Sequence, residues 1–326
     1  MSMTIKLWGV RGSLPSPYPP TSIESRLVSA IEKFMALRHT AGDAREFVKS
    51  LPLAERGGFG GNTLCVEIER AGDQRIIIDA GSGIRALGEK LMSYPVGRGK
   101  GEAHILFTHF HWDHLLGLPF FPPIFIPGNT IHLYGVQEDL EHNIRQIFKK
   151  PFFPVPFEAL GAKVIFHRLK PREKVQIAGF DVTPYKLDHP DPCWGYRVEL
   201  GGRAYAHCVD TEGTRVSRQD LGEDLGLYQK ADLMFFDAQY TMLEAAEKMN
   251  WGHSAAPIGL ELALREGVKR VLFAHHDPGA SDDKIADAER QTRDFLEAFR
   301  EQARRANRIV PDVEWAFALE GQEIIL

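Results

Sequence analysis

The stretch Thr108-His109-Phe110-His111-Trp112-Asp113-His114 determines how this chain is organised. It follows the apolar run Ile105-Leu106-Phe107, which predicts a buried strand, so the ligand-type side chains lie in the loop at a strand end. His109 and His111 are two residues apart, and an extended segment directs such side chains to the same side. Asp113 and His114 come after a turn and can face a second point nearby. Imidazole and carboxylate are the ligands of zinc and similar ions, so the stretch predicts a metal site.

The pattern Thr-His-x-His-x-Asp-His after an apolar strand resembles the signature of the metallo-β-lactamase superfamily. The resemblance implies an α/β fold, an αββα sandwich of two mixed β-sheets flanked by helices. Strand-like and helix-like patterns alternate in both halves of the 326 residues, without linker composition or an internal repeat. We therefore expect one domain over residues 1–326.

A helical insertion is expected at about residues 20–56. Ile23, Leu27, Ile31 and Phe34 recur at intervals of three and four residues, which is typical of an amphipathic helix. Asp43 is placed to cap a second helix that ends near Ser50. We favour a surface element packed on the domain over a substrate lid.

Composition limits the partners and the compartment. A formal net charge of -5 argues against a strongly basic nucleic-acid face, although it leaves room for a small nucleotide. The odd set Cys65, Cys193 and Cys208 indicates a reducing cytoplasm rather than a disulfide scaffold. No signal peptide or membrane-spanning run is evident, so we expect a cytoplasmic protein without a membrane partner. A homodimer is one arrangement that the sequence permits.

Further ligand-type residues follow other expected strands. His189 ends the segment Leu187-Asp188-His189, Asp210 follows the strand 203–209, and the strand 271–274 delivers His275 and His276. The resemblance implies that His109, His111 and His189 hold a first metal, that Asp113, His114 and His275 hold a second, and that Asp210 bridges them. We choose His275 over His276 because it follows directly on its strand.

Asp79 and a glycine cluster each allow two interpretations. The resemblance implies that Asp79, after Ile76-Ile77-Ile78, orients the ligand loop as an outer hydrogen-bond partner, whereas the alternative is a cap for a helix starting near Ile84. The segment Gly57-Gly58-Phe59-Gly60-Gly61-Asn62 is either a turn or a backbone cradle for an anion.

The aromatic and proline-rich segment 118–127 either walls a substrate pocket or covers the core.

Three protein ligands per ion leave open positions, which is typical of a catalytic site. We expect two divalent ions, zinc first and manganese or iron as alternatives. Two ions that share a hydroxide lower the pKa of water from about 16 to about 7, so the expected chemistry is metal-assisted hydrolysis. Asp113 is expected to contribute to catalysis as well as to metal binding.

His253, in Trp251-Gly252-His253-Ser254, indicates the substrate class. It resembles the additional histidine of the phosphodiesterase branch, which includes tRNase Z and a cyclic-phosphate phosphodiesterase. There this residue stabilises the phosphoryl transition state or protonates the leaving oxygen. In tRNase Z a glutamate three residues before the bridging aspartate partners the histidine. Here that position is His207, and Glu212 or Asp237 could take over the role.

The chain has no clear glycine-rich and basic arm for gripping tRNA. We therefore expect a small phosphodiester substrate, a cyclic nucleotide or a cyclic phosphate, rather than a nucleic acid. Two alternatives use the same fold: a thioesterase or lactonase of the glyoxalase II type, and an iron-dependent oxidoreductase. The complete set of histidine ligands argues against the oxidoreductase.

Overall fold

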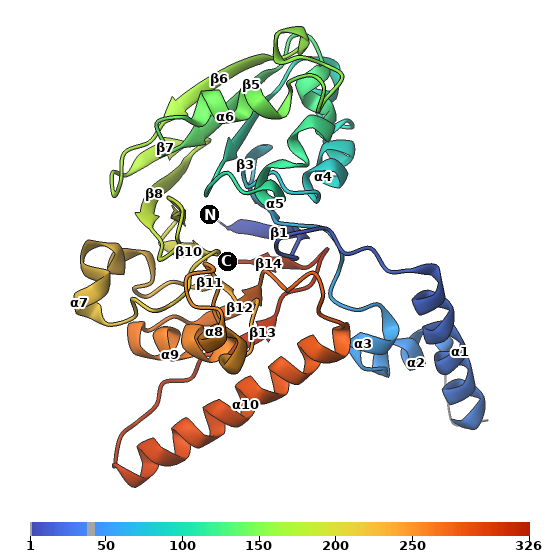
Figure 1. The fold of residues 1–326 in the computed structure, drawn as a ribbon, viewed down its shortest axis with the longest axis vertical. Coiled ribbons are helices and arrows are strands. Elements are labelled where there is room, and N and C mark those ends of the chain that lie inside the picture. The colour runs from blue at the N-terminus through green and yellow to red at the C-terminus, as the bar shows by residue number, and fades with distance from the viewer. Residues whose placement is uncertain (1, 38–42) are drawn as a thin grey trace.

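The computed structural model describes residues 2–37 and 43–326. Two seven-stranded sheets lie face to face, with helices on their outer sides (Figure 1). The strand order is β14-β1-β2-β3-β4-β5-β6 in sheet one and β13-β12-β11-β10-β9-β8-β7 in sheet two. The predicted αββα sandwich of mixed sheets is confirmed.

Sheet one is antiparallel from β14 to β3 and parallel from β3 to β6. Its strands are β1 (Met3–Gly9), β2 (Cys65–Arg70), β3 (Gln74–Ile78), β4 (Glu102–Leu106), β5 (Thr130–Gly135), β6 (Lys163–Arg168) and β14 (Glu323–Ile325).

Sheet two is antiparallel from β7 to β10 and parallel from β10 to β13. Its strands are β7 (Val175–Ile177), β8 (Phe180–Lys186), β9 (Trp194–Leu200), β10 (Arg203–Cys208), β11 (Leu233–Asp237), β12 (Arg270–Ala274) and β13 (Glu314–Phe317).

Alternating side chains divide the core into three layers. Ile76 and Ile78 of β3 face the apolar layer between the sheets, whereas Ile77 faces the helices outside sheet one. This continuous run was expected to be buried on both faces, and all three side chains are fully buried. Strand β2 was expected to have one buried face, but its other face is also covered. There the Glu67 carboxylate is buried and pairs with Arg75 at 3.2 Å.

Helices cover both outer faces. The helices α4 (Ile84–Leu91) and α6 (Leu140–Ile147) pack on sheet one, and α9 (Ala256–Glu266) and α10 (Asp282–Arg305) pack on sheet two. Shorter helices are α5 (Trp112–Leu115), α7 (Arg218–Leu221) and α8 (Met242–Glu247). The 3₁₀ helices are η2 (Pro95–Arg98), η3 (Leu118–Phe120), η4 (Pro122–Phe125), η5 (Phe157–Ala159) and η6 (Gly222–Leu227).

Three helices lie in the described part of the segment expected to be a helical insertion, residues 20–37 and 43–56: α1 (Pro20–Leu37), α2 (Ala44–Ser50) and α3 (Leu53–Arg56). They lie beside the sandwich, near the start of α10 (Figure 1). The Asp43 side chain accepts a hydrogen bond from the Arg45 amide, so the expected cap of α2 is confirmed. The buried Asp282 carboxylate anchors the segment by accepting a hydrogen bond from Tyr18 at 2.9 Å and pairing with Arg26.

The glycine-rich turn does form an anion cradle, but it holds a carboxylate of this chain. The amides of Gly61 and Asn62 each donate to Glu320 Oε2 at 2.9 Å, and Asn62 Nδ2 donates to Glu320 Oε1 at 2.6 Å. In the proline-rich segment, Leu118, Phe121 and Ile124 are fully buried in the layer outside sheet one. That segment therefore covers the core.

Candidate metal centre

Strand ends deliver the ligand-type residues, and the backbone turns sharply there. Asp79 follows β3, Asp210 lies two residues after β10, and His275 follows β12. Their φ angles are 62°, 62° and 63°, in the left-handed region that non-glycine residues adopt rarely. Such backbone strain is concentrated at functional sites, where it aims a side chain that the strand direction alone would misplace.

Asp210 is the centre of the cluster. Its Oδ2 lies 3.1 Å from His109 Nε2 and 3.2 Å from His114 Nε2, and its Oδ1 lies 2.9 Å from His275 Nε2. His275 Nε2 is also 3.1 Å from Asp113 Oδ2. The two carboxylate oxygens therefore face different imidazoles.

The ligand-type residues form two adjacent groups, in each of which one donor atom per residue lies within 4.8 Å of the others. One group comprises His109, His111, His189 and Asp210, and the other comprises Asp113, His114 and His275. The structure thus brings together all seven residues that the sequence assigned to metal binding.

Outer hydrogen bonds leave one nitrogen of each imidazole for the cluster. Nδ1 is occupied in His114 by Asp79 Oδ2 at 2.8 Å, in His275 by Gln239 Oε1 at 2.7 Å, and in His189 by the Asp191 carbonyl oxygen at 3.0 Å. In His111 the occupied nitrogen is Nε2, which lies 2.9 Å from Asp191 Oδ2. Metal-binding histidines typically have such partners, which fix the tautomer and the ring orientation.

The nitrogen and oxygen atoms that converge in the cluster are suited to bind a cation. His109 Nε2, His114 Nε2, His189 Nε2 and both Asp210 oxygens are buried and have no hydrogen-bond partner. Buried polar groups left without a partner cost free energy, so their convergence needs a ligand to explain it. Imidazole nitrogens with carboxylate oxygens suit zinc and related divalent ions.

Protons balance the buried carboxylates when no cation is bound. Burial alone would raise the pKa of Asp113, but His114 and His275 lower it well below the usual range. Burial alone would lower the pKa of His275, but Asp210 and Asp113 raise it to about 10. A divalent cation would replace these protons.

His253 lies at the edge of the cluster and pairs with Asp237. Its Nδ1 is 3.0 Å from Asp237 Oδ2, and its ring stacks on His275 with 4.7 Å between centroids. Of the two expected partners, Glu212 instead accepts a hydrogen bond from the Gly252 amide at 2.9 Å. His207 points elsewhere: it is fully buried and bonds with the Tyr205 hydroxyl at 2.9 Å.

Two open alternatives are resolved by contacts. His276 Nε2 lies 3.0 Å from the Ala318 carbonyl oxygen, so His275 is the one in the cluster. The Asp79 carboxylate binds the Thr108 amide at 2.8 Å as well as His114, and α4 begins after Gly83 without a side-chain cap. Asp79 therefore orients the ligand loop, and its interpretation as a helix cap is wrong.

Three supporting residues were missed: Ser13, whose amide donates to Asp113 Oδ2 at 2.7 Å, Gln239 and Asp191. No local sequence pattern marked these residues. A Cβ on Gly12 would lie 2.2 Å from His275 Nδ1, but only the assembled fold shows that contact.

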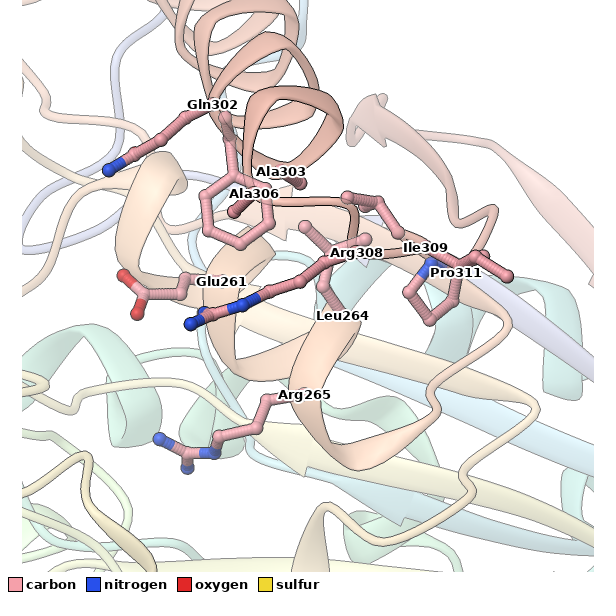
Figure 2. A pocket seen from close by; sticks show the side chains of 11 residues that line it. Glu261, Leu264, Arg265, Gln302, Ala303, Ala306, Arg308, Ile309 and Pro311 are labelled. Carbon is pink, nitrogen blue, oxygen red and sulfur yellow. The ribbon is translucent and has the colours of Figure 1, made fainter.

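Two exposed tryptophans neighbour cluster residues in the sequence. Trp112 follows His111 and is 68% exposed, and Trp251 is 64% exposed. The Trp251 loop packs on the cluster, because a Cβ on Gly252 would lie 2.3 Å from His189 Cδ2. A separate pocket of about 520 Å³, between α9 and the end of α10, contains Glu261, Arg265 and Arg308 but none of the ligand-type residues (Figure 2).

Residues 74–276 match the family described as the beta-lactamase superfamily domain. The chain belongs to this superfamily, and the prediction from the central stretch is confirmed. The ribonuclease Z of Staphylococcus haemolyticus is 24% identical over 274 residues, which cover 69% of this chain and 84% of that protein. The ribonuclease Z of Staphylococcus carnosus is 25% identical over 161 residues, and the match spans 46% of each chain.

The fold agrees with solved structures. The metallo-β-lactamase fold protein YhfI from Bacillus subtilis superposes with a TM-score of 0.61 at 15% identity over 99% of each chain. The relatives also support the prediction of a hydrolase. Within residues 2–37 and 43–326, no helix has the length and apolar character to cross a membrane.

Proposed function

We propose that this protein is a metal-dependent phosphodiesterase that acts on a small phosphodiester, a cyclic nucleotide or cyclic phosphate. His109, His111 and His189 would hold one divalent cation, Asp113, His114 and His275 a second, and Asp210 would bridge them. Bound cations of this kind polarise phosphoryl oxygens and lower the pKa of water. The ribonuclease Z relatives support phosphodiester chemistry.

The observation that carries the proposal is the pair of His253 and Asp237 beside the cluster. Asp237 is fully buried and holds His253 Nδ1 at 3.0 Å, so Nε2 is the nitrogen left for a substrate. A protonated imidazole there can stabilise charge on the phosphoryl group and then give its proton to the leaving oxygen. Glu212, bonded to the Gly252 amide, would position this loop rather than exchange protons.

The exposed Trp112 and Trp251 side chains favour a substrate with a flat group. Indole faces stack on nucleobases, typically with about 1–3 kcal/mol per base. Lys248 Nζ lies 4.2 Å from the centre of the Tyr240 ring and 5.9 Å from the centre of the Trp251 ring, which adds a positive charge beside this loop. These features fit a nucleoside cyclic phosphate better than a substrate without a base.

A substrate panel with three variants tests the proposal. Wild-type protein should hydrolyse bis(p-nitrophenyl) phosphate and nucleoside cyclic phosphates, and Asp210→Asn should reduce turnover to background. His253→Ala should lower kcat on phosphodiesters by about 10²–10⁴-fold. Trp251→Ala should raise KM for the nucleotide while leaving bis(p-nitrophenyl) phosphate less affected.

The same panel includes thioesters and lactones, for which the His253 pair has no evident use. Faster turnover of these substrates, with His253→Ala unaffected, would overturn the phosphodiesterase assignment. Cleavage of precursor tRNA in preference to every small phosphodiester would overturn the proposal that the substrate is small. Asp220→Asn, an exposed change in α7, serves as the control for handling and folding.

A further inference from the structure

A second group of ligand-type side chains lies at the other end of sheet one. Glu102 begins β4, whereas the ligand loop of the candidate metal centre follows the opposite end of that strand. Glu102 and His104 are two residues apart and project from the same face of the strand. His132 of β5 stands directly beside His104 in the parallel register. Strand β5 lies toward the upper part of Figure 1.

The three side chains converge without bonding to one another. Glu102 Oε2 lies 3.8 Å from His104 Nε2 and 3.8 Å from His132 Nε2. These distances are too long for hydrogen bonds. They are slightly longer than the roughly 3.3 Å that separates two ligands on one tetrahedral zinc ion with bonds near 2.0–2.2 Å.

Outer hydrogen bonds again fix the imidazoles. His104 Nδ1 lies 3.0 Å from the Tyr134 hydroxyl, and His132 Nδ1 lies 2.8 Å from His167 Nε2. When each Nδ1 donates its proton outward, each Nε2 presents its lone pair toward Glu102. His132 Nε2 is buried and has no hydrogen-bond partner.

We propose that Glu102, His104 and His132 form a second binding site for a divalent transition-metal ion such as zinc, separate from the candidate metal centre. Two nitrogens and one carboxylate oxygen suit zinc, cobalt, nickel or copper, whereas calcium and magnesium take oxygen ligands. A cavity of about 350 Å³ that includes Glu102 and His104 in its lining connects the site with solvent. A bound ion would cross-link β4 and β5 where their parallel pairing begins.

An ion pair between Glu102 and the histidines explains the cluster less well. The Glu102 carboxylate stands 3.8 Å from both Nε2 atoms, beyond hydrogen-bond distance, and the hydrogen bonds of the two imidazoles are made by their Nδ1 atoms.

Zinc stoichiometry of the full chain tests the proposal. Metal-free wild-type protein and the variants Glu102→Gln and His132→Gln are titrated with zinc by calorimetry, and metal content is measured after dialysis. Both variants should bind one equivalent less than wild type and should keep wild-type turnover of the best phosphodiester substrate. His142→Gln, at an exposed histidine of α6, is the matched control and should bind as wild type does.

Glu102 is exposed, so its variant keeps the fold even if His132→Gln does not. Equal zinc stoichiometry in wild type and Glu102→Gln would overturn the proposal. So would zinc-soaked crystals in which anomalous scattering is confined to the residue 109–114 cluster. A protein that binds the extra equivalent but hydrolyses no phosphodiester would refute the proposed function and leave this site standing.

Discussion

Asp237 contacts both His253, the candidate general acid, and Asp210, the candidate bridging ligand. One oxygen of its carboxylate accepts from His253 at 3.0 Å and from the Asp210 amide at 3.1 Å, and the other accepts from the amides of Ser254 and Gln239. Asp237→Asn should therefore lower kcat by about 10–100-fold, as is typical when an outer partner is lost. KM should change less.

Metal content separates the positioning of His253 from damage to the metal centre, because Asp237 contacts both His253 and the Asp210 amide. Asp237→Asn should lose kcat while it keeps the zinc stoichiometry of the wild type. Asp220→Asn, the exposed change in α7, is the control. An Asp237→Asn enzyme with wild-type kcat would contradict the assigned role of the pair.

His275 makes metal binding depend on pH. In the metal-free protein its pKa is raised to about 10 by Asp210 and Asp113, against the effect of burial, so it carries a proton at pH 7.5. Only the neutral imidazole binds a cation. Zinc binding at pH 7.5 should thus release protons, and affinity should rise with pH until about pH 10.

Calorimetry in buffers of different ionisation enthalpy measures this release directly. The slope of observed enthalpy against buffer enthalpy should show net protons leaving the protein. Zinc binding without proton release at pH 7.5 would mean that His275 is already neutral, contrary to its contacts with two carboxylates.

Among the structural elements, the glycine-rich turn after α3 depends on Glu320. Three donors of the turn converge on one carboxylate in the loop between β13 and β14. Glu320→Ala leaves these donors without their acceptor and should cost about 2–3 kcal/mol of unfolding free energy. Denaturant unfolding measures the loss.

Glu314→Ala is the matched control, because its carboxylate is exposed and pairs with Arg270 at the surface. Exposed ion pairs contribute roughly 0–1 kcal/mol. Equal losses in the two variants would show that the turn does not need its carboxylate.

In the whole molecule, the candidate metal centre joins the two sheets. His109, His111, Asp113 and His114 follow β4 of sheet one, whereas His189, Asp210 and His275 follow strands of sheet two. Bound cations should therefore stabilise the complete sandwich. Zinc at 100 times its dissociation constant contributes about 2.7 kcal/mol.

Thermal unfolding should show a lower Tm after chelation and recovery with zinc. Asp210→Asn should reduce the recovery, and the Glu102→Gln background removes the contribution of the second proposed site. If chelation leaves the Tm unchanged, the cations do not stabilise the contact between the two sheets.

Local sequence was sufficient for several features. Strand positions could be predicted because continuous β-branched runs such as Ile76-Ile77-Ile78 favour strands buried on both faces, and helix α2 because Asp43 supplies a cap. The metal-ligand types in residues 109–114 could be identified because three histidines and one aspartate lie within six consecutive residues, at a spacing typical of a metal site.

Contacts between distant segments could be decided only by the tertiary structure. The sequence determined which residue types stand at the strand ends. The order of strands in the two sheets decided that Asp237 partners His253, that Glu320 fills the glycine-rich turn, and that His132 lies beside His104. These pairings span 16 to 259 positions along the chain. A local pattern carries no information on such pairings, because they depend on strand register and on the packing of side chains from distant segments.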